Sequence, residues 1–121
     1  MTGVPPVVDG AAETISLYRA VSAAELNDIL EYGGFRQHPA GFSLEAKLFA
    51  TSAHAAANWG RTLHRLDKGP FTIVQARVPR ALAVQLEQMQ LDQWPAVVVS
   101  AERLAAFNAA VAIEVLPYVP L

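Results

Sequence analysis

The chain has 121 residues, a net charge of −2 and a hydrophobic fraction of 53%, which supplies enough apolar material for the core of one domain. Only 17% of its residues are charged, and this balance argues against broad electrostatic binding of nucleic acid, which needs a basic face. The absence of cysteine excludes disulfides, thiolate metal ligands and a cysteine nucleophile.

The N-terminal segment, residues 1–14, contains two prolines and two glycines and has no hydrophobic period. We expect it to be a flexible tail or linker, with residues 15–121 forming a single domain. No apolar run approaches the roughly 20 residues of a membrane helix, and no secretion signal opens the chain. We therefore expect no association with membranes.

The first expected elements are a strand over residues 15–22 and a helix over residues 23–32. Ser22 is placed to cap the helix, and Glu25, three residues later, completes the pattern of a capping box. Gly33 follows the helix at a position where a left-handed conformation commonly ends it.

A second strand is expected over residues 45–51, followed by a helix over residues 53–66 that begins after Ser52. Residues 71–79 alternate between two sets of side chains and indicate a third strand. The remaining expected elements are a helix over 80–89, a loop over 91–95, a strand over 96–99, a helix over 101–110 capped by Ser100, and a strand over 112–116.

This alternation of short strands and short helices predicts an α+β domain, with a small split sheet of mixed or antiparallel strands flanked by the helices. Neither GxGxxG nor GxxxxGK occurs, so neither standard nucleotide-binding loop is present. The histidines at 38, 54 and 64 are 16 and 10 residues apart, which is not a metal-ligand spacing, and we expect no metal site.

Two polar positions interrupt otherwise apolar segments. Arg19 lies inside the first expected strand, where a guanidinium is costly to desolvate unless it meets an anion. Ser52 lies at a junction between a strand and a helix, where a hydroxyl can cap the helix or contact a polar ligand. Together they predict a cleft for a phosphate-bearing ligand; the alternative is an Arg19 paired with Glu25 or Glu31 and a Ser52 that only caps.

Five segments in this order resemble the C-terminal toxin domains of Rhs-type polymorphic effectors, which belong to the ADP-ribosyltransferase superfamily. The resemblance covers roughly residues 15–117. The segments are Tyr18-Arg19-Ala20-Val21-Ser22, Gly33-Gly34-Phe35, Lys47-Leu48-Phe49-Ala50-Thr51-Ser52, Ala56-Ala57-Asn58-Trp59-Gly60 and Phe71-Thr72-Ile73-Val74-Gln75-Ala76-Arg77-Val78-Pro79.

The resemblance implies an ADP-ribosyltransferase-like fold and a reaction on NAD. Arg19 matches the arginine that holds the phosphate or ribose of NAD, and Thr51 and Ser52 match the motif that supports the nicotinamide ribose. Phe49 and Trp59 are candidate aromatic walls for nicotinamide; for Trp59, a place in the core is the alternative.

This chain departs from the family pattern at the acidic element, because it has no clean Glu-x-Glu. Asp92 is the first candidate for the catalytic acid and Glu102 is the second, with Glu45 and Glu114 as further options. Asp92 as a turn former and Glu102 as a first-turn helix acid are the alternatives.

The expected function is that of an antibacterial mono-ADP-ribosyltransferase toxin, which transfers ADP-ribose from NAD to a protein or RNA target in a competitor cell. The resemblance also implies a cognate immunity protein as partner, a monomeric domain, secretion as part of a larger effector without a signal peptide, and action in the target-cell cytoplasm. The alternatives are an NAD glycohydrolase toxin and a degenerate, non-catalytic binding module.

Overall fold

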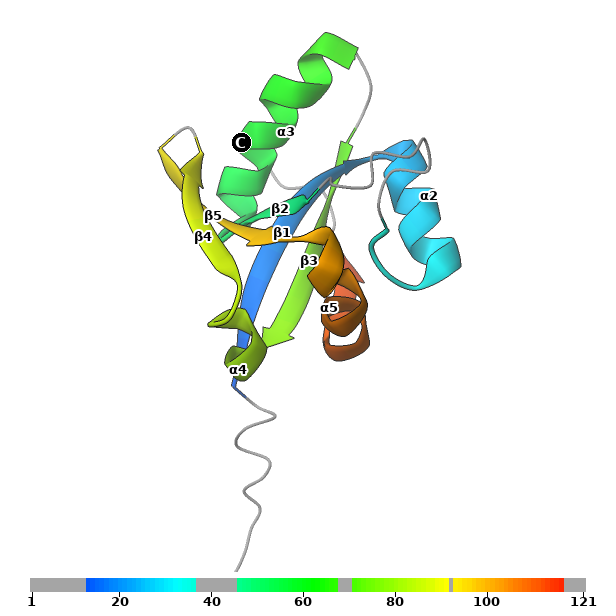
Figure 1. Cartoon of the computed structure of the whole chain (residues 1–121). Coiled ribbons are helices and arrows are strands. Elements are labelled where there is room, and N and C mark those ends of the chain that lie inside the picture. The colour runs from blue at the N-terminus through cyan, green and yellow to red at the C-terminus, as the bar shows by residue number, and fades with distance from the viewer. Residues whose placement is uncertain (1–12, 37–45, 68–70, 92, 117–121) are drawn as a thin grey trace, which may run out of the picture.

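The computed structural model describes residues 13–36, 46–67, 71–91 and 93–116, which form one six-stranded sheet with helices on both faces (Figure 1). The strands are β1 (Thr14–Ser22), β2 (Lys47–Ala50), β3 (Phe71–Pro79), β4 (Glu87–Leu91), β5 (Trp94–Val99) and β6 (Ala112–Val115). The helices are α2 (Ala23–Tyr32), α3 (Ala53–Asp67), α4 (Arg80–Ala83), the 3₁₀ turn η1 (Ala101–Arg103) and α5 (Leu104–Ala110).

The sheet has the strand order β4-β5-β2-β1-β3-β6, and all its neighbours are antiparallel. β1 pairs with β3 along its whole length, from Thr14 opposite Pro79 to Ser22 opposite Phe71. Between β1 and β2, in contrast, the register contains the single pair Tyr18–Ala50. We call this β1–β2 boundary the seam, because it joins the half β4-β5-β2 to the half β1-β3-β6.

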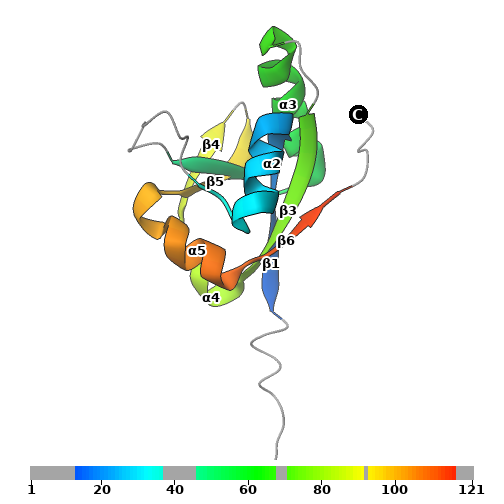
Figure 2. The same cartoon turned by 90° about the vertical axis from the view of Figure 1, so that its right-hand side faces the viewer.

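The two faces of the sheet are covered by different helices, as the two perpendicular views show (Figures 1 and 2). On the face covered by α2 and α5, alternate residues of the strands form the larger core, including Leu17 and Val21 of β1. On the opposite face, the alanines of α3 pack against the intervening strand residues, among them Tyr18 and Ala20. We call these the α2 face and the α3 face.

Three aromatic rings form the centre of the core on the α2 face. Phe35, Phe49 and Phe107 are all almost completely buried. The Phe49 ring centroid lies 5.1 Å from that of Phe35, in a T-shaped contact, and 5.2 Å from that of Phe107. Phe35 follows α2, Phe49 belongs to β2 and Phe107 belongs to α5, so this cluster fixes the two helices against the sheet.

The helix α2 begins and ends where its residues predict. Ser22 Oγ accepts a 3.1 Å hydrogen bond from the Glu25 backbone N–H, as a cap at this position does. Gly33 has φ = 87°, and its N–H donates to the carbonyl oxygen of Ile29 at 2.8 Å. The carboxylate of Glu25 bonds to Arg19 instead of completing the capping box.

A close approach between α3 and the sheet is set by Gly60. A Cβ atom at this position would lie 2.6 Å from a ring atom of Phe71 and 2.9 Å from the Cβ of Ala20. The missing side chain therefore lets α3 approach β1 and β3 more closely than any other residue would allow.

The α+β class is confirmed, and the bounds predicted for residues 23–32 and 71–79 agree with α2 and β3. The helix predicted over 80–89 is wrong: α4 ends at Ala83, and Glu87–Leu91 forms β4. β4 pairs with β5 across a tight turn in which Gln93 has φ = 71°. In β4, pairing with β5 outweighs the helix propensity of the glutamate, glutamines and methionine of this strand.

Further boundaries need correction. The loop predicted over 91–95 is shorter, because β4 continues to Leu91 and β5 begins at Trp94. The predicted tail includes Glu13 and Thr14, but Thr14 begins β1 and the carbonyl oxygen of Glu13 accepts a bond from Arg80 N at 3.1 Å; residues 1–12 lie outside the described residues. The helix predicted over 101–110 begins as η1, and the Ser100 side chain makes no capping bond.

Within the described ranges, no helix has the length and apolar character needed to cross a membrane.

Candidate functional site

The candidate site is a cluster of three charged side chains at the seam, on the α2 face. Arg19 comes from β1, Lys47 from β2, and Glu25 from the first turn of α2. Glu25 accepts two hydrogen bonds from Arg19, at 2.7 Å from Nε and 3.2 Å from Nη2. Its Oε2 atom also lies 3.7 Å from Lys47 Nζ. One carboxylate thus links cations from both halves of the sheet, and we call these three residues the seam cluster.

Arg19 makes a further contact across the seam. Its Nη1 donates a 3.0 Å hydrogen bond to the backbone carbonyl oxygen of Leu48 in β2. Since the register joins β1 to β2 only at Tyr18–Ala50, this side chain supplies a bond between the strands beyond that pair. The pairing of Arg19 with Glu25, which the sequence offered as the alternative to a phosphate-bearing ligand, is confirmed.

The seam cluster is largely removed from water. The side chain of Lys47 is only 6% exposed, and those of Arg19 and Glu25 are 19% and 22% exposed. Burial raises the pKa of the Glu25 carboxyl, but the hydrogen bonds and charge of Arg19 and the charge of Lys47 outweigh it, so this pKa lies below its ordinary value. Glu25 is therefore ionised near neutral pH.

The charges of the seam cluster do not cancel: two cations share one carboxylate, which leaves a net charge of +1. The next acid on α2, Asp28, is paired with Arg36, and the nearby charge of Lys47 also helps to lower the pKa of its carboxyl. Arg19 carries five N–H donors, of which three are used by Glu25 and Leu48. Two N–H groups of the Arg19 guanidinium therefore have no hydrogen-bond partner among the described residues.

The hydroxyl residues predicted to share a cleft with Arg19 lie elsewhere. Ser52 Oγ accepts a 3.1 Å hydrogen bond from Ala55 N, which makes it the cap of α3 on the α3 face. Thr51 precedes it and is exposed. Arg19 contacts Glu25 of α2 on the other face. The contacts of Arg19 and Ser52 therefore direct these two side chains to opposite faces of the sheet.

The two aromatic residues predicted to contact nicotinamide also lie on different faces. Phe49 is fully buried in the aromatic cluster of the α2 face. Trp59 is 8% exposed and packs in the core of the α3 face, which was the alternative considered for it. Its Nε1 atom is buried without a hydrogen-bond partner among the described residues.

The candidate acids are not brought to the seam cluster by any contact of the described residues. Glu102 is exposed on η1. Glu114 is exposed on β6, where its Oε1 lies 3.6 Å from Nη1 of Arg77. Asp92 and Glu45, the other two candidates, lie outside the described residues.

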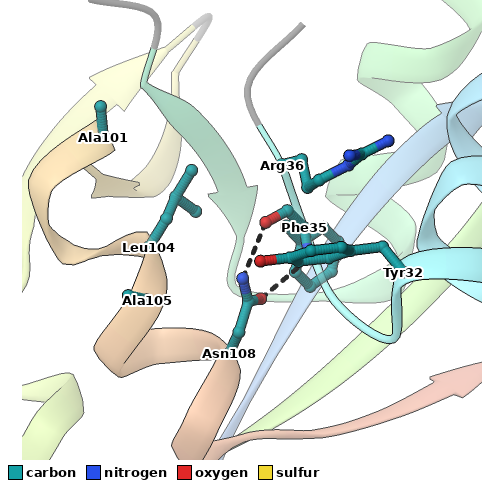
Figure 3. A pocket seen from close by; sticks show the side chains of 7 residues that line it. All are labelled: Tyr32, Phe35, Arg36, Ala101, Leu104, Ala105 and Asn108. Carbon is teal, nitrogen blue, oxygen red and sulfur yellow. Dashed lines mark hydrogen bonds between the residues drawn. The ribbon is translucent and has the colours of Figure 1, made fainter. Parts of the chain in front are cut away.

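A cavity of about 330 Å³ opens on the α2 face between the end of α2 and α5 (Figure 3). Asn108 closes its floor, donating to the carbonyl oxygen of Phe35 at 2.7 Å and accepting from the Phe35 N–H at 2.8 Å. At its rim, the Arg36 guanidinium lies 4.9 Å from the centroid of the Tyr32 ring. A second cavity, of about 300 Å³, lies between α2 and β6 and is mostly apolar. Of the predicted site residues that the structure describes, none lines either cavity.

The residue that sequence reasoning missed is Lys47. The sequence did contain a signal for it. Side chains alternate along the strand Lys-Leu-Phe-Ala, so a lysine on the same side as a core phenylalanine faces the interior.

In the described part of the chain, no group of acids and histidines is arranged to hold a metal ion. Comparison of the chain with protein-family models, with curated proteins and with solved structures finds no match.

Proposed function

We propose that this chain is an NAD-dependent mono-ADP-ribosyltransferase, acting as an antibacterial toxin domain on a protein or RNA target. The observation that carries the proposal is the seam cluster, in which Arg19 of the first strand and Lys47 of the second share one carboxylate and retain a net positive charge. A diphosphate is the part of NAD that such a cluster binds best, because a guanidinium can bond two phosphate oxygens at once.

The family resemblance supports the proposal because Arg19 matches the arginine that holds the phosphate or ribose of NAD. The architecture supports it because the sheet is divided into two halves. A split sheet flanked by short helices is what the resemblance implies. The single pair between β1 and β2 divides the sheet into two three-stranded halves with Arg19 at their boundary.

The reaction would release nicotinamide from NAD and leave positive charge on the ribose, which a nucleophile of the target then attacks. Arg19 and Lys47 would fix the diphosphate, so that the sugar is held in one orientation during this step. A carboxylate would stabilise the charge on the sugar; Asp92 and Glu102 are the residues proposed for it. Ser52 caps α3 on the opposite face of the sheet, so the proposal gives it no contact with a ribose held beside Arg19.

A second candidate function, a non-catalytic binding module, is favoured by one specific observation. Glu25 already occupies two donors of Arg19, and no acid other than Glu25 contacts the seam cluster among the described residues. A domain that binds a diphosphate without cleaving the glycosidic bond needs only the cations.

The decisive experiment is to incubate the protein with biotinylated NAD and a bacterial lysate and to probe for labelled protein and RNA. The variant Arg19→Lys keeps the charge but loses the planar fork, and Arg77→Met removes an exposed cation of β3 as the matched control. Labelling that is lost in Arg19→Lys and kept in Arg77→Met supports the transferase.

Nicotinamide release measured without any acceptor separates the remaining candidates. Rapid release without labelling indicates an NAD glycohydrolase, which is the enzymatic alternative. Binding of ADP-ribose without nicotinamide release or labelling indicates the binding module and overturns the enzymatic proposal.

The proposal further includes a cognate immunity protein that covers the site, a monomeric toxin domain, delivery within a larger effector and action in the target-cell cytoplasm.

A further inference from the structure

The lysine of the seam cluster is placed where an apolar residue would be expected. Lys47 is 5% exposed, and its neighbours on the same strand face, on β2 and β5, include the buried Phe49 and Val99. Burying an ammonium is costly unless close partners compensate it. Its Nζ lies 3.7 Å from Glu25 Oε2, which is longer than a hydrogen bond, and that oxygen already accepts a 2.7 Å bond from Arg19.

Packing alone does not account for this charge. A methionine has a similar volume and would fill the same space without the cost of desolvating an ammonium. Glu25 compensates it only in part, because Lys47 Nζ lies 3.7 Å from an oxygen that also accepts a hydrogen bond from Arg19, and Asp28 adds a second negative charge that acts on it. An anionic ligand would add to the compensation that these two carboxylates, among the described residues, give the ammonium.

The position of Lys47 relative to Arg19 indicates the kind of anion. The two cations belong to adjacent strands on either side of the seam, and both approach the same carboxylate. Arg19 and Glu25 are partly exposed, so a ligand can reach these two residues of the seam cluster from solvent. Two cations that approach the same carboxylate oxygen from adjacent strands would offer one cation to each of two linked anionic groups, as in a diphosphate.

We propose that Lys47 is the second diphosphate-binding residue of the site, acting beside Arg19, and that Glu25 holds the two cations in register as their shared counter-ion. This inference rests on the proposed function, since the diphosphate is that of NAD. It assigns a role in binding to a residue that neither the family resemblance nor the strand pattern singled out.

The test compares Lys47→Met with wild type in binding of ADP-ribose and of pyrophosphate by calorimetry. We expect the affinity for both to fall about tenfold or more, because a hydrogen bond to a charged group is lost. Thermal stability should change little, since Glu25 keeps its two hydrogen bonds to Arg19 and methionine fills a similar volume. Arg77→Met, which removes an exposed cation from the sheet, should leave both affinities unchanged.

Other outcomes separate this inference from the proposed function. If Lys47→Met binds both ligands as tightly as wild type, the role of Lys47 is overturned even where NAD is consumed. If wild type binds neither ligand, the diphosphate site itself is overturned. If wild type binds ADP-ribose through Lys47 but consumes no NAD, the enzymatic proposal fails and the binding role stands. In an active protein, Lys47→Met should raise the KM for NAD and leave kcat nearly unchanged, as expected for binding shared by ground and transition states.

Discussion

Arg19 reaches across the seam to β2, where its Nη1 donates a 3.0 Å hydrogen bond to the carbonyl oxygen of Leu48. The same guanidinium holds Glu25 through its other two nitrogens. One side chain thus connects β1, β2 and the first turn of α2. The structure gives Arg19 a mechanical role in the sheet in addition to the binding role proposed for it.

Replacing Arg19 by methionine should therefore destabilise the fold. We expect a loss of about 1–3 kcal/mol in the free energy of unfolding, because Glu25 and the Leu48 carbonyl both lose a donor in a partly buried place. Urea denaturation measures this loss. The matched variant Arg77→Met removes a cation that is 49% exposed, and we expect it to stay within about 0.5 kcal/mol of wild type. Equal effects for the two variants would contradict the mechanical role.

The pH dependence of stability should report on Glu25. Its folded-state pKa lies below the unfolded-state value, so its contribution to stability is complete above the unfolded-state pKa and is lost as the pH falls through the folded-state one. Glu25→Gln should therefore be less stable than wild type near neutral pH, and the difference should shrink below about pH 4.

Urea midpoints measured from about pH 7 down to about pH 3 test this expectation. Glu114→Gln is the control, because its ion pair with Arg77 is exposed on both sides and should contribute little at any pH. A difference between Glu25→Gln and wild type that stays constant with pH would show that the carboxylate charge does not matter.

Asn108 should be a major determinant of stability on the α2 face. Its side chain bonds to both the N–H and the carbonyl oxygen of Phe35, and it thereby attaches the segment after α2 to α5 (Figure 3). Asn108→Ala leaves both backbone groups without these partners, and we expect a loss of about 1–3 kcal/mol. Asn58→Ala, in which only an exposed bond to His54 is lost, should cost much less in the same urea titration.

The substitution Gly60→Ala should reverse the usual order of helix propensity. In an ordinary helix, alanine is more favourable than glycine by about 1 kcal/mol. Here the new Cβ would collide with Phe71 and Ala20, so we expect a loss of about 1–3 kcal/mol instead. A double-mutant cycle with Phe71→Ala should reduce the cost, because the closest contact is removed. A stabilised Gly60→Ala variant would show that α3 is not held at this distance.

The elements with strong local signals were the ones that the sequence predicted well. Ser22, Gly33 and the alternation over residues 71–79 mark α2 and β3 with their observed bounds. β4 was missed because an edge strand exposed along its length has no hydrophobic alternation, and its residues favour a helix when considered alone. The strand order was not predictable either, because alternation shows which face of a strand is buried but not which strand pairs with which.

The candidate site was likewise predictable only where a local sequence signal existed. A charged residue inside a strand signals that a partner is needed, and this singled out Arg19 together with its alternative partner Glu25. The sequence could not show that β2 would place Lys47 beside the same carboxylate, since that depends on the pairing of β2 within the sheet. The separation of Ser52 from Arg19 also depends on tertiary structure, because it follows from α3 and α2 covering opposite faces.

The two outermost strands of the sheet present different side chains to solvent. β4 is almost wholly exposed and mostly polar, with Glu87 as its one charged residue. β6 lies at the other edge, with Ile113 and Val115 beside the apolar cavity against α2 and with Glu114 as its one charged residue. A partner strand with apolar side chains would therefore find apolar neighbours at the β6 edge and polar ones at the β4 edge.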